Sequence, residues 1–159
     1  MRISYDFYET KGVKASAVAL GFFDGLHAGH RKVIEAAVAE KANGLTACVF
    51  TFTLGGERPQ SKEGARLLQT ESLKERYMEE AGVDFYYSPQ FDQFKSLSPR
   101  DFVDALREKL GAKVLCCGEN FRFGAGAKGD IHLLGELCDE FGIRLVQVPS
   151  VCLLGEVVS

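Results

Sequence analysis

The chain has 159 residues, a net charge of −3, 46% hydrophobic residues and 26% charged residues. This length and composition are typical of one globular domain, and they exclude a coiled coil, a collagen-like fibre and a disordered chain. The longest apolar run, residues 17–23, is far shorter than the roughly 20 residues that cross a bilayer. The small negative charge does not indicate a nucleic-acid or membrane surface, so we expect neither as a partner.

The cysteines and the N-terminus indicate a reducing compartment. The five cysteines are odd in number, include no CxxC pair and have no histidine at metal-ligand spacing. Cys48, Cys116 and Cys117 lie in apolar stretches, which is typical of buried reduced thiols. Residues 1–12 carry charged side chains and lack the apolar segment of a signal peptide. We therefore expect a cytoplasmic protein.

Strand and helix signals alternate along the chain. Short apolar or β-branched runs predict five strands, at residues 15–20, 45–52, 83–87, 113–117 and 143–148. Apolar residues at helical spacing predict helices over residues 28–43, 70–81, 99–110 and 131–141. Thr70 and Ser98 are expected N-caps, with Pro99 and Asp101 strengthening the second. Repeated strand–helix–strand units form right-handed crossovers, so the expected fold class is α/β, a parallel sheet with helices on both faces.

Glycine is over-represented, with 17 residues, about 11% of the chain against an average of about 7%. Some follow predicted helices as left-handed C-caps, namely Gly44, Gly82, Gly111 and Gly142. Others gather directly after two predicted strands, namely Gly21, Gly25, Gly29, Gly118, Gly124, Gly126 and Gly129. Parallel sheets bind ligands beyond the carboxyl ends of their strands, so both stretches are predicted to line a ligand site. The polar segment 53–69 is interpreted as a loop, either a functional lid or an insertion.

The first glycine-rich stretch, residues 21–30, places two of the three histidines near a helix start. His27 is expected at the helix entrance and His30 within the first turn. Free N–H groups at a helix N-terminus bind phosphate, and two imidazoles add donors for the charge on a transferring phosphate. Surface histidines and a zinc site are the alternatives, and zinc lacks a suitable third ligand nearby. We predict that both histidines act on phosphate groups.

The second stretch, residues 118–130, contains a literal GxGxxG at residues 124–129. A dinucleotide-binding fingerprint needs its glycines directly after a strand and an acidic residue about 20 positions on. Here six residues intervene after Cys117, and Pro149 stands near the expected acid. A loop that wraps a ligand is the better interpretation.

Side chains in this second loop suit a phosphorylated, flat ligand. Arg122 and Lys128 can meet phosphates. Phe121 and Phe123 alternate with Arg122, so one ring can enter the core while another lines a pocket for a flat ligand, or both can belong to the core.

These segments together resemble a known family. Residues 21–30 match the G-x-F-D-G-x-H-x-G-H signature of the nucleotidyltransferases, and the FDG variant resembles the FAD synthetase (FMN adenylyltransferase) domain of bacterial bifunctional riboflavin kinase/FAD synthetases. Residues 91–103 are similar to that family's F…LSP.EFV segment, and residues 118–130 to its G-[ED]-[ND]-F-R-F-G…G-D loop. The resemblance covers roughly residues 13–159.

The resemblance implies a fold, an activity and a set of site residues. The fold would be the Rossmann-like fold of HUP-type nucleotidyltransferases with a five-stranded parallel sheet. The activity would be transfer of AMP from ATP, with Mg²⁺, to FMN, giving FAD and pyrophosphate. His27 and His30 would be catalytic and Phe123 would lie near the flavin ring, with no metal held by the protein itself. The nucleotide-binding residues would be Gly21, Phe22, Phe23, Asp24, Gly29, Asn120 and Arg122.

Two departures and two alternatives accompany this interpretation. The family's F-x-P-H-P element is replaced by residues 52–59, which lack the His-Pro pair. Residues 157–159 match only the first letters of the family's serine/threonine–arginine motif. We therefore expect residues 1–159 to be one FMN adenylyltransferase domain, truncated within that motif, whose full-length chain carries a riboflavin kinase domain. The alternatives are a nucleotidyltransferase of the same fold with another phosphorylated acceptor, and a nucleotide- or flavin-binding module without activity.

Overall fold

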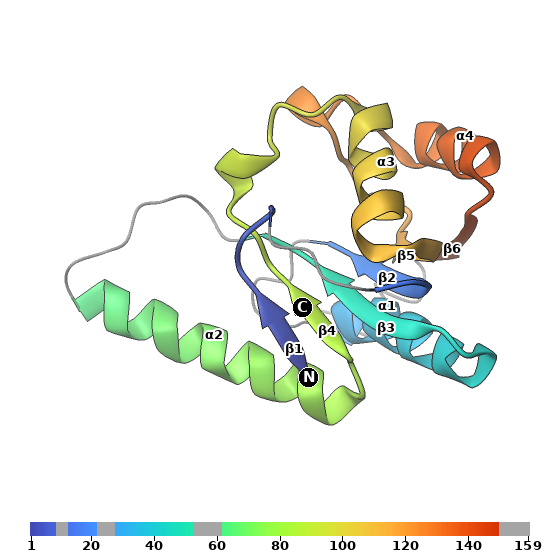
Figure 1. Ribbon diagram of the computed structural model, residues 1–159. Helices are drawn as coiled ribbons and strands as arrows, with labels where there is room; N and C mark the ends of the chain where they lie inside the picture. Colours follow the sequence, from blue (N-terminus) through green and yellow to red (C-terminus); the bar gives the residue numbers. More distant parts are fainter. Residues whose placement is uncertain (9–12, 22–27, 53–61, 150–159) are drawn as a thin grey trace.

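A computed structural model describes residues 1–8, 13–21, 28–52 and 62–149 (Figure 1). Six strands form one parallel sheet in the order β1-β4-β3-β2-β5-β6. The strands are β1 (Arg2–Ser4), β2 (Ser16–Leu20), β3 (Thr46–Phe50), β4 (Phe85–Tyr87), β5 (Ala112–Gly118) and β6 (Arg144–Val148). The α-helices are α1 (Ala28–Ala39), α2 (Lys62–Ala81), α3 (Pro99–Leu110) and α4 (Ile131–Phe141). Short 3-10 turns are η1 (Glu40–Asn43), η2 (Phe91–Gln93) and η3 (Ala125–Ala127).

The α/β fold class and the five predicted strands are confirmed, but the sheet has a sixth strand that the sequence did not reveal. The edge strand β1 covers only Arg2–Ser4, and its residues show no apolar run. It is a strand because it pairs with β4, with Ser4 opposite Tyr87. The count of five strands was therefore wrong, since a strand this short depends on its partner and not on local propensity.

The second predicted helix was also placed incorrectly at its start. Helix α2 begins at Lys62, so Thr70 lies inside the helix and is not its N-cap. Part of the predicted loop 53–69 is therefore helical, and the remainder, residues 53–61, lies outside the described residues. The segment from Lys62 is rich in Lys, Glu, Ala, Arg and Leu, which favour helix in spite of Gly64.

The helices cover the two faces of the sheet in pairs, α1 with α2 on one face and α3 with α4 on the other (Figure 1). Strand residues alternate between these layers. In β2, Val18 and Leu20 pack with the α3 and α4 side chains, whereas Ala17 and Ala19 pack with α1. Small alanines on this face allow α1 to lie close to the sheet.

Predicted helix ends are confirmed by backbone geometry. The four predicted C-cap glycines have positive φ, at Gly44 (83°), Gly82 (99°), Gly111 (59°) and Gly142 (72°). At Gly111 a Cβ atom would lie 2.2 Å from the carbonyl oxygen of Lys14, so only glycine fits. The Ser98 hydroxyl accepts a hydrogen bond from the Asp101 N–H at 3.1 Å, as an N-cap does.

The described cysteines are buried and unpaired, as predicted. Cys48, Cys116, Cys117 and Cys138 are buried and form no disulfide with one another, while Cys152 lies outside the described residues. Burial raises the pKa of the Cys48, Cys116 and Cys117 thiols to about 12 and that of Cys138 to about 11. These thiols are therefore protonated and unreactive at neutral pH.

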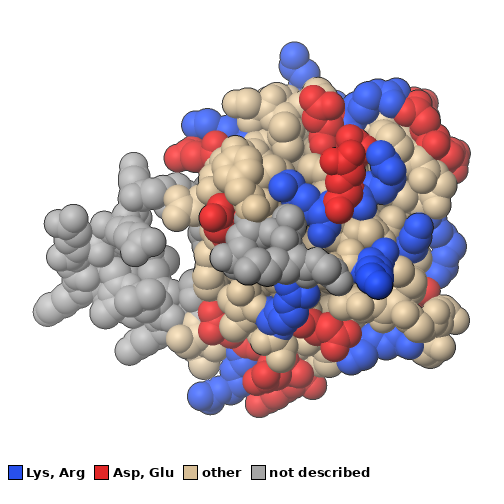
Figure 2. Space-filling model, viewed as in Figure 1, with Lys and Arg blue, Asp and Glu red and all other residues tan. Residues whose placement is uncertain are grey.

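Two further observations concern charge distribution and helix hydropathy. Figure 2 shows one face of the molecule, on which acidic and basic side chains of the described residues are interspersed. In the ranges that the structure describes, no helix is both long and apolar enough to cross a membrane.

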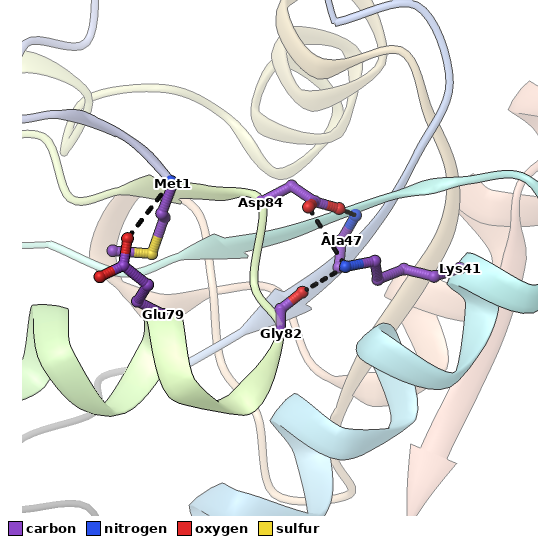
Figure 3. Close-up of polar contacts among 6 residues, drawn as sticks. All are labelled: Met1, Lys41, Ala47, Glu79, Gly82 and Asp84. Carbon is purple, nitrogen blue, oxygen red and sulfur yellow. Dashed lines mark hydrogen bonds and ion pairs between the residues drawn. The ribbon is translucent and has the colours of Figure 1, made fainter.

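A carboxylate joins three elements at the amino-terminal edge of the sheet (Figure 3). Asp84, just before β4, accepts hydrogen bonds from the Ala47 N–H at 3.0 Å and the Lys41 ammonium at 3.2 Å. Lys41 also donates to the carbonyl of Gly82 at 2.9 Å. In the same view the N-terminal amine of Met1 lies 3.5 Å from the carboxylate of Glu79, which is 67% exposed. The first group ties η1, β3 and β4 together, whereas the second is a surface ion pair.

We expect Asp84→Ala to lower the free energy of unfolding by about 1–3 kcal/mol, because the N–H of the buried Ala47 loses its acceptor. Glu79→Ala is the control and should change stability by less than about 0.5 kcal/mol, as exposed ion pairs contribute little. Urea unfolding followed by circular dichroism measures both. Equal effects of the two substitutions would contradict this assignment.

Candidate functional site

A cavity of about 720 Å³ opens where the strands end. Its described lining comes from the ends of β2 and β3, the residues before and at the start of α3, and the loop after β5. Seven of the lining residues are phenylalanines, Phe50, Phe52, Phe91, Phe94, Phe102, Phe121 and Phe123. The other lining residues are Gly21, Lys95, Ser96, Arg122, Gly124, Ala125, Gly126 and Ala127. A cavity of this size with so many aromatic lining residues suits a planar ring ligand.

The cavity lies at the switch point of the sheet. From β2 the chain order runs to β3 and β4 on one side and to β5 and β6 on the other. Gly21 follows β2, and the loop carrying Arg122 follows β5, so both border the crevice between these strands. Open α/β sheets bind ligands at this point.

The rings of Phe121 and Phe123 form the part of the wall that the sequence singled out. Their planes are nearly parallel at 9°, with centroids 5.9 Å apart, and Phe123 also packs on Phe102 at 5.7 Å. Phe123 is only 5% exposed and belongs to the core, whereas Phe121 is partly buried. Both rings line the cavity, so Phe123 serves core and cavity together, and Phe121 is the more accessible ring.

Close contacts fix the glycines of the loop after β5. Phe123 and Gly129 form an antiparallel bridge, with the Gly129 N–H donating to the Phe123 carbonyl at 2.9 Å. A Cβ atom on Gly129 would lie 2.7 Å from the Phe123 ring, and one on Gly124 would lie 2.8 Å from Pro99. The Ala125 N–H donates to the Leu97 carbonyl at 2.7 Å. The literal GxGxxG is therefore a loop packed on the start of α3, and its role in wrapping a ligand stays a prediction.

The structure places only some of the residues predicted to bind phosphate. His30 is the third residue of α1, within its first turn as expected, and is partly exposed. Gly29 also lies in this turn, and the Gly21 N–H donates to the Phe50 carbonyl at 3.3 Å. The remaining residues of this motif, Phe22, Phe23, Asp24 and His27, lie outside the described residues. Since α1 follows β2, its N-terminus lies at the same edge as the cavity.

The predicted nucleotide-binding residues after β5 are exposed. Asn120 and Arg122 lie in this loop, and Arg122 lines the cavity. Asp130 ends the loop and caps α4, since its carboxylate accepts a hydrogen bond from the Leu133 N–H at 2.9 Å. This hydrogen bond is the main cause that lowers the pKa of Asp130, with the charges of His132 and Arg122 adding to it. Asp130 therefore stays ionised near Arg122.

Sequence reasoning missed most of the cavity wall. Phe50, Phe52, Phe91, Phe94 and Phe102 were not predicted to line it. A phenylalanine in a strand or helix predicts burial. The local sequence does not distinguish a phenylalanine that packs in the core from one that lines a cavity. Lys95, which also lines the cavity, was missed as well. Its ammonium pairs with the exposed Asp92 at 3.0 Å.

Within the described ranges, no group of three or more His, Cys, Asp or Glu side chains could hold a metal ion. The expectation that the protein itself supplies no metal ligand stays a prediction.

A six-stranded parallel sheet with helices on both faces and a cavity at its switch point defines a Rossmann-like α/β fold. A macrolide-efflux protein from Streptococcus pneumoniae superposes with a TM-score of 0.71 at 24% identity, covering 92% of this chain and 49% of that one. A pantoate-β-alanine ligase from Francisella tularensis superposes with a TM-score of 0.55 at 16% identity, covering 94% of this chain and 67% of that one. At these identities the likeness shows the fold alone.

The family follows from the sequence comparison. The FAD synthetase family model matches residues 10–159, and the chain belongs to this family. The bifunctional riboflavin kinase/FMN adenylyltransferase of Escherichia coli K12 is 34% identical over 145 residues, covering 85% of this chain and 44% of that protein. The equivalent Bacillus subtilis protein is 35% identical over 133 residues, covering 78% of this chain and 40% of that protein. A FAD synthetase of Listeria monocytogenes is 28% identical over 144 residues, covering 89% of this chain and 58% of that protein. The chain thus spans about half the length of these relatives or less.

We expect Gly129→Ala to destabilise the protein by about 1–3 kcal/mol, because the added methyl group overlaps the Phe123 ring. Gly135→Ala is the matched control. Gly135 lies inside α4, and its Cβ would meet only Leu145 at an ordinary 3.9 Å, so this change should stabilise by about 0.5–1 kcal/mol. If the loop is packed as described, thermal unfolding gives a lower Tm for Gly129→Ala and a higher Tm for Gly135→Ala. A change of Tm in the same direction for both variants would contradict this packing.

Proposed function

We propose that this protein is an FMN adenylyltransferase, a nucleotidyltransferase that moves AMP from ATP to FMN and releases FAD and pyrophosphate. One observation carries the proposal. A chain of the FAD synthetase family holds an aromatic cavity at the edge of the sheet where the N-terminus of α1 lies. The names of the relatives, FMN adenylyltransferase and FAD synthetase, support the same reaction.

The cavity supports the choice of a flavin as acceptor. Its volume of about 720 Å³ lies within the range of about 300–1,000 Å³ that is usual for small-molecule sites. The isoalloxazine is a flat, largely apolar tricycle, and the paired rings of Phe121 and Phe123 offer a surface for it. Arg122 and Lys95 line the same cavity, so their charges can meet the phosphate of FMN.

The proposed reaction is a direct in-line displacement. A phosphate oxygen of FMN forms a bond to the α-phosphorus of ATP. The bond from that phosphorus to the oxygen bridging to the β-phosphate breaks, and pyrophosphate leaves with the electron pair. His30, in the first turn of α1, and His27 would stabilise charge on the leaving group together with the N–H groups of the helix N-terminus. Catalysis then rests on positioning and charge stabilisation without a covalent intermediate.

The remaining partners belong to the same proposal. ATP would be bound by the backbone at Gly21 and Gly29, by residues 22–24, and by Asn120. Mg²⁺ would enter as the MgATP complex, where it neutralises charge on the phosphates. FMN would be supplied by a riboflavin kinase domain of the full-length chain, an activity that the names of the bifunctional relatives include. We further propose that the protein works in the cytoplasm.

The test is to incubate the purified protein with MgATP and FMN and to separate FAD from FMN by chromatography, with pyrophosphate measured in parallel. We expect equal amounts of FAD and pyrophosphate. Phosphopantetheine and nicotinamide mononucleotide, with ATP or CTP, serve as alternative acceptors. Turnover of either compound, with none of FMN, would overturn the assignment of FMN as the acceptor. Binding of FMN and ATP without turnover, in this chain and in the full-length protein, would favour a binding module.

We expect His30→Ala to lower kcat about 10²-fold or more, as loss of one preorganised donor to transition-state charge does, while KM for ATP changes only a few-fold. His132→Ala is the control, because His132 is also in the first turn of a helix, α4, but is exposed and lies outside the histidine motif of residues 21–30. Steady-state FAD formation measures both variants. Wild-type turnover in His30→Ala would remove His30 from the proposed catalytic residues.

A further inference from the structure

The N-terminal segment, residues 1–8, packs directly behind the aromatic cavity. It precedes residues 10–159, the part that the family model matches. Its strand β1 pairs with β4, and the Ser88 N–H donates to the Ser4 carbonyl at 2.9 Å. Beyond β1 the chain places Phe7 in the core, with 5% exposure, on the face of the sheet that carries the cavity.

The backbone of Phe7 is held on both sides. The side-chain oxygen of Gln93 accepts a hydrogen bond from the Phe7 N–H at 2.8 Å. The side-chain nitrogen of Gln93 donates to Asp6 at 2.9 Å. The buried hydroxyl of Tyr87 donates to the Phe7 carbonyl. Gln93 belongs to the 3-10 turn η2, so these bonds connect the N-terminal segment to that turn.

The ring of Phe7 continues this connection into the cavity wall. It stacks on the ring of Phe94, with centroids 5.5 Å apart and an angle of 27°. Phe94 follows Gln93 directly, lines the cavity, and contacts Phe50 at 5.3 Å and Phe91 at 5.6 Å. On the side of α3, the ammonium of Lys109 lies 4.6 Å from the centre of the Phe7 ring. The position of Phe94 is thus set both through the backbone of η2 and through ring packing.

We propose that Phe7 and Gln93 are positioning residues for the ring-binding cavity. They hold Phe94 at the wall, so a segment outside the family match determines how well a planar ring fits. The functional part of this inference rests on the proposed function, in which the planar ring is the flavin of FMN. Neither side chain lines the cavity among the residues described there, so both act through Phe94 and not on the ligand.

The same segment offers a matched control on the other face of the sheet. Tyr5 packs edge-on against Tyr86 at 6.2 Å, in the layer of α1 and α2, and its hydroxyl donates to the Glu75 carboxylate. Tyr5→Phe therefore removes one hydrogen bond of the N-terminal segment and leaves the contacts on the cavity face of the sheet unchanged.

The experiment uses Phe7→Leu, Gln93→Met and Tyr5→Phe with two readouts. The first, without flavin, is hydrogen exchange at the amides of residues 94, 95 and 97, whose hydrogen bonds to Phe91 and Phe94 define this turn. The second is FMN affinity from quenching of flavin fluorescence, with KM for FMN and for ATP. We expect faster exchange and a roughly fivefold weaker FMN affinity in both Phe7→Leu and Gln93→Met. This is the size of one lost aromatic contact in the first variant and of one lost hydrogen bond in the second. KM for ATP should stay within about twofold, and Tyr5→Phe should change neither readout.

Unchanged exchange in both cavity-side variants would overturn the inference, as would an equal change in Tyr5→Phe. Faster exchange with unchanged FMN affinity would overturn the link to ring binding. Gln93→Met keeps the Phe7 ring, so it decides the matter if Phe7→Leu fails to fold. A wild-type protein that binds no FMN would contradict the proposed function, and the exchange rates alone would then decide whether these residues position Phe94.

Discussion

One continuous layer of aromatic rings, on the face of the sheet covered by α3 and α4, determines both the core and the cavity. Phe50 at the end of β3 is its centre, with edge-on contacts to Tyr87 at 5.4 Å, Phe94 at 5.3 Å and Phe102 at 5.5 Å. These contacts join two strands, the residue that follows η2 and helix α3. Protein interiors are close-packed, so a displaced ring moves its neighbours. The shape of the cavity is therefore fixed by the packing that stabilises the domain.

Where α1 packs, the opposite face of the sheet is built from smaller residues, and it serves a different part of the site. Ala17, Ala19 and Ala47 face α1, whose Ile34 and Ala37 pack among them. The close helix places its N-terminus at the end of β2, and the N–H groups of a helix N-terminus are suited to bind phosphate. A ring cavity on one face and a helix N-terminus on the other thus meet at the carboxyl edge. The proposed transfer of AMP to a flavin phosphate would use both, the cavity for the flavin ring and the helix N-terminus for phosphate groups.

How far the sequence predicts this arrangement depends on whether a signal is local. The start of α3 was predicted correctly, because Ser98 and Pro99 specify a helix N-terminus within a few residues. Strand β1 was not, because its partner Tyr87 is more than 80 residues away. The same distinction holds in the site. The glycine and histidine motifs are local in the sequence. Whether Phe94 lines the cavity depends instead on how residues from other parts of the chain pack around its ring, which the local sequence does not specify.

The glycines after β5 show why a motif needs its structural context. Residues 124–129 match the letters of a dinucleotide fingerprint, in which glycines make room for a pyrophosphate. Here Gly129 makes room for the Phe123 ring and Gly124 for Pro99. The Gly124 contact lets the loop pack on the start of α3. The Gly129 contact lets the loop pack on the Phe123 ring, which lines the cavity. At both positions the missing Cβ atom makes room for a side chain of the protein itself, so these two glycines shape the cavity.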